Sequence, residues 1–297
     1  MSDALKEEFV GNRVMEKHAF FVHLPTWLSP LFGPISPEQL EQLTASSYFY
    51  FRFVLAIDHL LDAAPAAGGG SAAATERLLG FCELYERAVR GLVGLFPGND
   101  PFWDSLAACK GQYARSNVHE KEFGALRGPF TREAFEALAA DKSAVCNAVV
   151  YALSRLGGTD APVAALLNCL NHVHVAFQCM DDVEDFSLDW DQGQYTYAHA
   201  LVESHLEAAA IDARALDGAR VHPYLYTSGV ADALYGLGQE HYAQGILIAR
   251  SLGLGPLADL LNHYSDRMGF YRRDIAAKLA RAGQGVAPAL DTALITG

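Results

Sequence analysis

The stretch FQCMDDVEDFSLDWDQGQYTY, from Phe177 to Tyr197, decides the fold of this chain. It places six acidic side chains within eleven positions, directly after the uncharged run Ala161 to Met180. Because a helix carries partial negative charge at its C-terminal end, acids there are unfavourable unless something cationic compensates. The nearest downstream basic residue, Arg214, is too far along the chain to cap this helix locally. A divalent cation is the simplest compensation; a salt bridge from another helix and a solvated acidic helix end are the alternatives.

The composition describes a globular protein with a large apolar core. Of 297 residues, 51% are hydrophobic and 19% are charged, and 35 acidic against 22 basic residues give a net charge of -13. No stretch concentrates Lys and Arg with aromatic residues in the way that a nucleic-acid-binding surface requires, so we expect no nucleic-acid partner. No metal-binding cysteine spacing occurs, which predicts reduced thiols. The start, MSDALKEEFVGNR, has no apolar segment, and this predicts a cytoplasmic protein without a secretory signal.

The uncharged run Ala161 to Met180 is long enough to raise the question of a membrane span. Five polar side chains interrupt it, namely Asn168, Asn171, His172, His174 and Gln178. These polar groups favour a helix that lines a polar cavity in a soluble bundle over one that faces lipid. We therefore expect no membrane span.

Apolar residues recur at intervals of three and four, and alternating β-branched runs are scarce, so the chain is predicted to be all-α. We expect a single domain over residues 1–297, with 1–35 as an N-terminal extension. The segment AAPAAGGGSAAAT after Asp62 predicts a flexible link. The predicted helices cover roughly residues 37–62, 74–95, 101–124, 131–156, 161–188, 193–210, 226–251 and 255–282.

Two pairs of carboxylates end strongly apolar helices. Asp181 and Asp185 are four residues apart and share one helix face. In YFYFRFVLAIDHLLD, Asp58 and Asp62 form a second such pair, and Phe51 lies on the face of Asp58. Two carboxylates at the end of an apolar helix cost free energy unless they are paired or hydrated. Two such ends in one chain favour metal binding over coincidence.

The pattern FQxxDDxxDxxxDxxxGxxTY resembles the second aspartate-rich motif of the trans-prenyl diphosphate synthases, which belong to the class I isoprenoid synthases. Three further matches follow the order of that family. Asp58 and Asp62 stand where its first aspartate-rich motif belongs, Gln112 follows a glycine, and Lys142 precedes a serine where the family has a Lys-Thr pair. Together the matches cover roughly residues 45–200.

This resemblance implies an antiparallel helical bundle of the isoprenoid synthase type around a deep apolar cavity. In that family two acidic motifs face each other across the cavity mouth and bind three Mg²⁺ ions, which hold the diphosphate of an allylic isoprenyl substrate. Metal and basic groups stabilise the leaving pyrophosphate, and an allylic carbocation remains in the cavity. Family members commonly dimerise, so a homodimer is one of the oligomeric states that the resemblance leaves open.

The resemblance also assigns roles to residues. The predicted catalytic metal ligands are Asp58, Asp62, Asp181, Asp182 and Asp185. The predicted diphosphate contacts are Lys142, Gln178, Gln112, Arg115 and Arg272, with Arg267 and Arg273 as further candidates. Phe51 and Phe177 are expected as cavity walls whose rings face a carbocation. His174 could act as a base, but a lone histidine in an apolar helix is more often a core residue with satisfied hydrogen bonds.

The chain departs from the chain-elongating synthases in one respect that concerns the reaction. After Asp62 no basic residue occurs until Arg77, and GNRV at Gly11 to Val14 supplies one charge only, so the second-diphosphate site of those enzymes is missing. We therefore expect a Mg²⁺-dependent terpene synthase that cyclises one allylic diphosphate, although the usual NDxxSxxxE motif is absent. Prenyl transfer is the alternative, either head-to-head, as the squalene and phytoene synthase-like pattern DxxED suggests, or to another acceptor. A non-catalytic isoprenoid-binding subunit ranks third.

Overall fold

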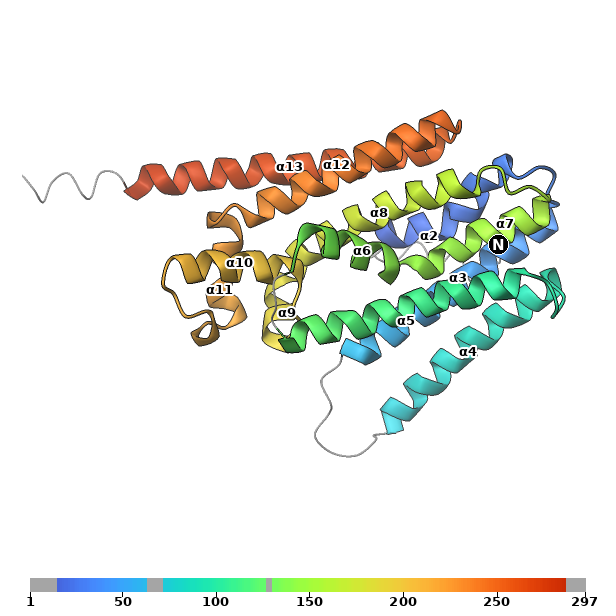
Figure 1. Cartoon of the computed structure of the whole chain (residues 1–297), viewed down its shortest axis with the longest axis horizontal. Coiled ribbons are helices and arrows are strands. Elements are labelled where there is room, and N and C mark those ends of the chain that lie inside the picture. Colours follow the sequence, from blue (N-terminus) through green and yellow to red (C-terminus); the bar gives the residue numbers. More distant parts are fainter. Residues whose placement is uncertain (1–14, 63–71, 127–129, 287–297) are drawn as a thin grey trace, which may run out of the picture. The chain divides into compact units, whose positions relative to one another are not determined.

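The computed structural model describes residues 15–62, 72–126 and 130–286, and every regular element in these ranges is a helix (Figure 1). The predicted all-α class is confirmed. The N-terminal start, Gly11 to Val14 and the link after Asp62 lie outside the described residues. The elements, with η for a 3₁₀-helix, are α2 (Met15–Leu28), η1 (Ser29–Leu31), α3 (Pro37–Asp62), α4 (Ala72–Leu95), α5 (Phe102–Leu126), α6 (Arg132–Lys142), η2 (Ala144–Asn147), α7 (Ala148–Gly157), α8 (Val163–Glu184), α9 (Phe186–Gln192), α10 (Tyr197–Ala208), η3 (Ala213–Ala215), α11 (Gly218–Thr227), α12 (Val230–Ser251) and α13 (Gly255–Val286).

The chain forms two compact units, and each is described by itself. Unit 1 comprises Met1–Ser116, Asp141–Asn168 and Ser251–Pro256. Unit 2 comprises Asn117–Ala140, Cys169–Arg250 and Leu257–Gly297. The assignment of the whole chain to a single domain stays a prediction.

In unit 1, α3 packs antiparallel against α4 because small residues let the two backbones approach. The side-chain amide of Gln42 donates to the carbonyl of Gly91 at 2.7 Å. A Cβ atom at Gly91 would overlap the hydroxyl oxygen of Ser46, so a larger residue there would require the Ser46 side chain to move. Helix α2 also packs on α3 and α7. We did not predict α2, since Pro25 lies inside it and proline normally disfavours a helix interior.

Two predicted helices are divided in the structure, and one further helix was not predicted. The helix predicted over 131–156 is interrupted by η2, which follows Lys142 at the end of α6. Such a 3₁₀ turn within a helical stretch often marks a functional position. The helix predicted over 161–188 stops at Glu184, and α9 begins at Phe186. Helix α11, which contains Pro223, was not predicted.

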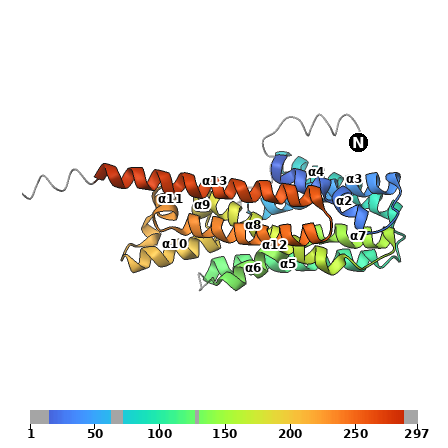
Figure 2. The same ribbon diagram turned by 90° about the horizontal axis from the view of Figure 1, so that it is seen from above.

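In unit 2, α12 lies against both α8 and α13, which Figure 2 shows in a second view. A Cβ atom at Gly238 would lie 2.7 Å from the Met268 side chain and 3.4 Å from that of Cys179. Farther along α12, one at Gly245 would lie 3.5 Å from Val173 of α8. The contacts of these two glycines show that α12 runs antiparallel to α8.

Helix α8 is the one described helix that is long and apolar enough to cross a membrane, and 56% of its most apolar 18-residue window is buried. This burial is what a core helix of a bundle shows. The expected cytoplasmic location stays a prediction.

Candidate active site

The acidic end of α3 lies in unit 1. Asp58 is half-buried, and the hydroxyl of Tyr113 on α5 donates to its Oδ1 at 3.4 Å. Asp62 is the last residue of α3, and its side chain lies outside the described part of the structure. Sequence reasoning named Gln112 and missed its neighbour Tyr113, because no spacing signal distinguishes one polar residue of α5 from the next.

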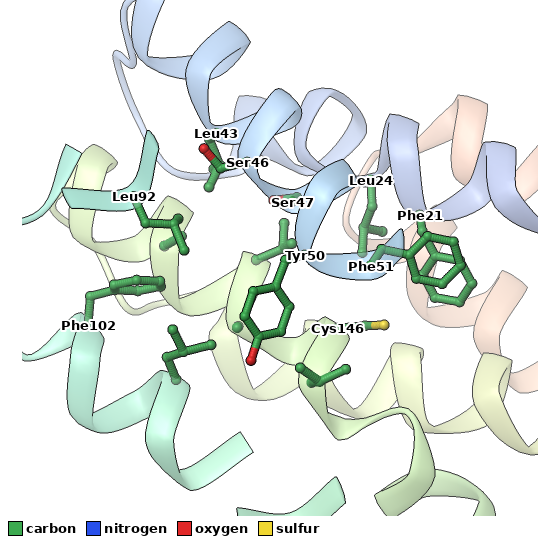
Figure 3. Close-up of a pocket in the computed structure, with 15 residues that line it drawn as sticks. Phe21, Leu24, Leu43, Ser46, Ser47, Tyr50, Phe51, Leu92, Phe102 and Cys146 are labelled. Carbon is green, nitrogen blue, oxygen red and sulfur yellow. The ribbon is translucent and has the colours of Figure 1, made fainter. Parts of the chain in front are cut away.

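An apolar pocket lies in unit 1 beside the same helix (Figure 3). Phe51, the predicted cavity wall, stacks on Phe21 with ring centroids 4.3 Å apart at one side, and Leu92 and Phe102 stand at the other. Tyr50 lies between them, and burial raises the pKa of its hydroxyl well above the usual range. The lining comes from Phe21, Leu24, Leu43, Ser46, Ser47, Tyr50, Phe51, Leu92, Phe102, Leu106, Val145, Cys146, Ala148, Val149 and Ala152.

The pocket is small as it stands. Its empty space is about 540 Å³ including the open side, but the cavity volume proper is about 50 Å³, which is room for a few water molecules. A long hydrocarbon would therefore require rotamer changes among the lining side chains.

The acidic end of α8 lies in unit 2, and its carboxylates differ in environment. Asp181 is half-buried and Asp185 is exposed, whereas Asp182 is buried with 2% of its surface exposed. The amide nitrogen of Gln178 donates to Asp182 Oδ1 at 2.8 Å, and the backbone N–H of Ala198 donates to its Oδ2 at 3.3 Å. Both Asp182 oxygens thus bind protein donors, so this side chain ties the start of α10 to α8.

The later positions of the motif build the return of the chain. Gly193 adopts a left-handed conformation, with φ of 74°, which ends α9 without the steric cost that a side chain would bring. Thr196 caps α10, and His199 completes a capping box by accepting from the Thr196 N–H at 3.1 Å. The other nitrogen of His199 donates to the Phe186 carbonyl at 2.9 Å. Gly193 and Thr196, the later positions of the motif, therefore shape the turn between α9 and α10.

Aromatic and basic side chains of α12 and α13 lie near Asp181. Phe177, one turn before Asp181, contacts the rings of Tyr242 and Tyr264 edge-on, with ring centroids 6.2 and 5.6 Å apart. Burial raises the pKa of the Tyr242 hydroxyl well above its usual value; Tyr264 and Asp181 raise it further, and Arg267 opposes them. Tyr242 therefore lies close enough to the Asp181 carboxylate and to the Arg267 guanidinium for both charges to change its pKa.

The remaining predicted diphosphate contacts belong to both units. The guanidinium of Arg272 donates hydrogen bonds to the two carboxylate oxygens of Asp232, at 2.8 and 2.9 Å, and to the side-chain oxygen of Gln239 at 3.1 Å. In unit 1, Lys142 is half-buried at the end of α6 and Arg115 is exposed. The roles of these three residues as diphosphate contacts stay predictions.

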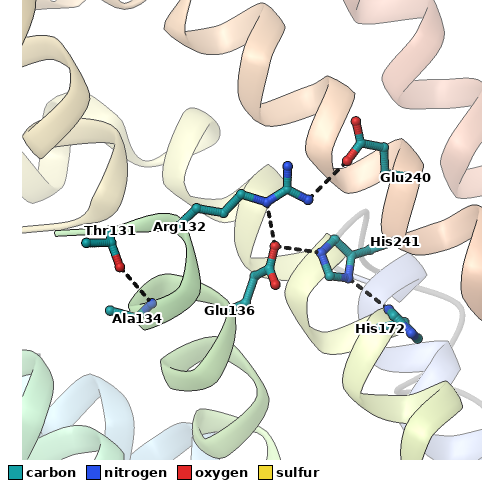
Figure 4. A network of polar contacts seen from close by, with 7 residues as sticks. All are labelled: Thr131, Arg132, Ala134, Glu136, His172, Glu240 and His241. Atoms are coloured by element: carbon teal, nitrogen blue, oxygen red, sulfur yellow. Dashed lines mark hydrogen bonds and ion pairs between the residues drawn. The ribbon is translucent and has the colours of Figure 1, made fainter.

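A polar network ties α6 to α8 and α12 within unit 2 (Figure 4). Arg132 bonds Glu136 at 2.7 Å and Glu240 at 3.1 Å. Glu136 lies 3.3 Å from Nε2 of His241, whose Nδ1 lies 3.0 Å from Nδ1 of His172. The carboxylate fixes the Nε2–H tautomer of His241, so His172 donates across the pair. Burial and the neighbouring His241 lower the pKa of His172, opposed by Glu136, and we interpret the network as structural.

The donor set at the end of α8 fits Mg²⁺. In the described part of the chain, no three His, Cys, Asp or Glu side chains converge closely enough to hold a metal by themselves. Mg²⁺ does not require such a cage, because it keeps several waters and is usually bound by one or two carboxylates together with substrate phosphates. Asp181, in the last turn of α8, and Asp185, which follows α8 directly and precedes α9, are donors of the right kind. The number of ions stays a prediction.

The chain matches no protein-family model and no curated protein. Among solved structures it is similar to the polyprenyl synthase of Caulobacter crescentus CB15, complexed with calcium and isoprenyl diphosphate, at 19% identity and a TM-score of 0.64, over 89% of this chain and 88% of that one. It is also similar to the geranylgeranyl pyrophosphate synthase of Lactobacillus brevis ATCC 367, at 14% identity and a TM-score of 0.68, over 86% of each chain.

A third similar structure is the octaprenyl pyrophosphate synthase of Helicobacter pylori, at 12% identity and a TM-score of 0.62, over 89% of this chain and 91% of that one. At such low identity these likenesses concern the fold. The chain has the helical scaffold of the trans-prenyl diphosphate synthases, as the motif over Phe177 to Tyr197 predicted.

Proposed function

We propose that this chain is a Mg²⁺-dependent prenyltransferase, which ionises an allylic isoprenyl diphosphate and passes the prenyl group to an acceptor. The observation that carries the proposal is the acidic end of α8, with Asp181 in its last turn and Asp185 directly after it, on a scaffold similar to that of prenyl diphosphate synthases. The names of those structures favour prenyl transfer, the alternative of the sequence analysis, over its first interpretation as a cyclase.

The acidic residues divide between two proposed roles, metal binding and positioning. Asp181 and Asp185 in unit 2, and Asp58 and Asp62 in unit 1, would hold Mg²⁺. When bound, the ion supplies the positive charge that stabilises the leaving pyrophosphate. Asp182 is a positioning residue, because its oxygens accept from Gln178 and from the Ala198 N–H. Asp182 would hold the end of α8 in place and so position the proposed metal ligands Asp181 and Asp185.

The apolar pocket of unit 1 is the proposed place for the hydrocarbon tail. It is lined by Tyr50 and Phe51, which precede Asp58 on the same helix by eight and seven residues, about 12 and 10 Å along the axis. A diphosphate held near Asp58 would thus leave its tail beside these rings. Apolar side chains offer a hydrocarbon chain burial without competing polar groups.

Cyclisation is a second candidate, and one observation favours it. No basic residue occurs between Asp62 and Arg77, and by the resemblance to the chain-elongating synthases this favours cyclisation over elongation, because the second-diphosphate site would be missing. A reaction of one allylic diphosphate with itself needs no such site. Transfer to an acceptor without a diphosphate needs none either, so the sequence permits both reactions.

The test is to incubate the purified chain with geranyl, farnesyl and geranylgeranyl diphosphates, with and without Mg²⁺, and to measure pyrophosphate and extracted products. Mg²⁺-dependent pyrophosphate release with an acceptor-dependent prenylated product is expected. A cyclic hydrocarbon from one substrate would establish the cyclase instead, and a doubled carbon skeleton would establish head-to-head transfer. No pyrophosphate under any condition would reject both enzymatic candidates and leave the binding subunit. Dimerisation, which ultracentrifugation would detect, stays a prediction.

A further inference from the structure

His174 of α8 is the starting point. It precedes Asp181 by seven residues, which places it on nearly the same helix face, two turns and about 10 Å farther from the acidic end. Its side chain is buried, with 1% of its surface exposed. Phe177 and Gln178 occupy the turn between His174 and Asp181. His174 therefore lies in the buried wall beneath the proposed metal ligand.

Neither ring nitrogen of His174 has a hydrogen-bond partner among the described residues. The expectation of a core histidine with satisfied hydrogen bonds is wrong in this respect. Two other buried histidines of unit 2 show the usual arrangement: both nitrogens of His199 are bonded, to Thr196 and Phe186, and both nitrogens of His241 face polar partners. Burial lowers the pKa of His174 to about 3, so the ring is neutral and carries one donor and one acceptor.

Tyr242 provides a second, independent observation in the same wall. Its hydroxyl is fully buried and also lacks a partner within the described part of the chain. On α12, Gly245 lies against Val173 and Gly238 against Cys179, so Tyr242, between these glycines, stands at the level of Phe177. Buried polar groups are normally bonded, and two exceptions in one apolar wall require an explanation.

We propose that His174 and Tyr242 receive the hydroxyl group of the acceptor, and that the acceptor is an otherwise apolar alcohol or phenol, with water as the smallest member of the class. A hydroxyl matches the vacant groups, since it donates one hydrogen bond and accepts others. An alkene acceptor, or a prenyl chain that cyclises on itself, would leave both residues without a partner. This inference rests on the proposed prenyl transfer and names its acceptor.

The proposed step balances without a further reagent. The bond between the allylic carbon and the diphosphate oxygen breaks, and its electron pair leaves with pyrophosphate. A lone pair of the acceptor hydroxyl forms the new carbon–oxygen bond, and the hydroxyl proton passes to the unprotonated ring nitrogen of His174, with Tyr242 donating to the same oxygen. The products are a prenyl ether, or a prenyl alcohol where water is the acceptor, and pyrophosphate. This acceptor class also agrees with the expectation from the sequence that the second-diphosphate site is missing, because such an acceptor carries no phosphate.

The experiment uses the full chain with Mg²⁺ and farnesyl diphosphate in ¹⁸O-labelled water, with phenol, 1-octanol or isopentenyl diphosphate added as acceptor probes. The measured quantity is the amount of product with a new carbon–oxygen bond per pyrophosphate released. We expect such products with the hydroxyl probes or with water, and at least a tenfold lower ratio for His174→Leu. His205→Leu, the same exchange at an exposed histidine of unit 2, should leave the ratio unchanged.

The outcomes separate this inference from the proposed function. Pyrophosphate release with only isopentenyl-extended or hydrocarbon products overturns the inference, as does an unchanged ratio in His174→Leu. No release by the wild-type chain with any allylic diphosphate rejects the proposed function itself. Folding supplies a second readout: because His174→Leu removes two unpaired buried nitrogens, its Tm at pH 7 should equal or exceed that of the wild type. A lower Tm would show that the nitrogens are bonded within the protein, and this also overturns the inference.

Discussion

Helices α3 and α8 have the same plan but differ in the turns before their acids. Each is strongly apolar and leads into carboxylates four residues apart: Asp58 and Asp62 in α3, and Asp181 in the last turn of α8 with Asp185 directly after the helix. Seven residues before the first acid, α3 carries Phe51, which lines an apolar pocket, whereas α8 carries the unpaired His174. The same heptad position is thus apolar in one unit and polar in the other. We propose that Phe51 lines the place of the hydrocarbon tail and that His174 receives the acceptor hydroxyl.

The acidic ends are also held differently. Asp58 receives a hydrogen bond from Tyr113 at the long distance of 3.4 Å. At the end of α8, Asp182 is buried between two donors, and a capping box fixes the chain beyond it. The end of α8 is therefore held by hydrogen bonds within the protein.

The largest expected effect is on activity, from Asp181→Ala. Loss of a metal ligand that stabilises the leaving group should lower Mg²⁺-dependent pyrophosphate release by about 100-fold or more. The helical circular dichroism should not change, because Asp181 is only half-buried. Asp259→Ala, at an exposed acid of α13, is the control. Wild-type turnover in Asp181→Ala would remove α8 from the proposed metal site.

Asp182→Leu should act on stability first. The substitution leaves the Ala198 N–H and the Gln178 amide without their acceptor, for which we expect a loss of about 2–4 kcal/mol in the free energy of unfolding. Urea titration followed by circular dichroism measures it. Asp185→Leu, at an exposed site, should cost less than about 0.5 kcal/mol. Equal losses in the two variants would contradict the different roles given to these neighbours.

His174 should make stability fall with acid. Its folded pKa, about 3, lies below the unfolded value of 6.5, so the unfolded chain binds more protons between these values, and stability is lost as pH falls below 6.5. From pH 7 to pH 5 this site should remove about 2 kcal/mol from the free energy of unfolding. His174→Leu should lack that loss, whereas His205→Leu should keep it. Parallel pH profiles for all three proteins would show that His174 is not buried as a neutral ring.

The reverse exchange, Phe51→His, tests the apolar member of the pair. It removes the stacking on Phe21 and brings an imidazole into the apolar pocket, at an expected cost of about 1–2 kcal/mol. Urea titration at pH 7.5, where an ordinary histidine is neutral, measures the cost. Phe51→Leu, which keeps the site apolar, should cost less. A Phe51→His protein as stable as the wild type would mean that the two heptad positions are equivalent.

Tyr113→Phe should have the smallest effect. It deletes one long hydrogen bond to Asp58, so we expect a two- to fivefold weaker apparent affinity for Mg²⁺, which corresponds to about 0.4–1 kcal/mol. The dependence of pyrophosphate release on Mg²⁺ concentration measures it. A loss as large as that of Asp181→Ala would show that Tyr113 has a direct catalytic role.

Much of the fold was predictable because its signals are local. The three- and four-residue periodicity located α3 to its last residue, and the acidic motif over Phe177 to Tyr197 predicted the scaffold. Helix α2 and the interruption at η2 were missed, since packing around Pro25 and at the end of α6 overrides local preference.

The sequence by itself determined the helical class, the scaffold and the two acidic helix ends, because helix period and residue type alone bring carboxylates onto one face. Only the tertiary structure decided which acids are used internally and which polar groups are left without partners. Asp181 and Asp182 are neighbours in sequence, yet one is half-buried near Tyr242 and the other is bonded to the start of α10. Burial and hydrogen bonding depend on residues distant in the chain, and it is these contacts that separate a ligand from a structural anchor.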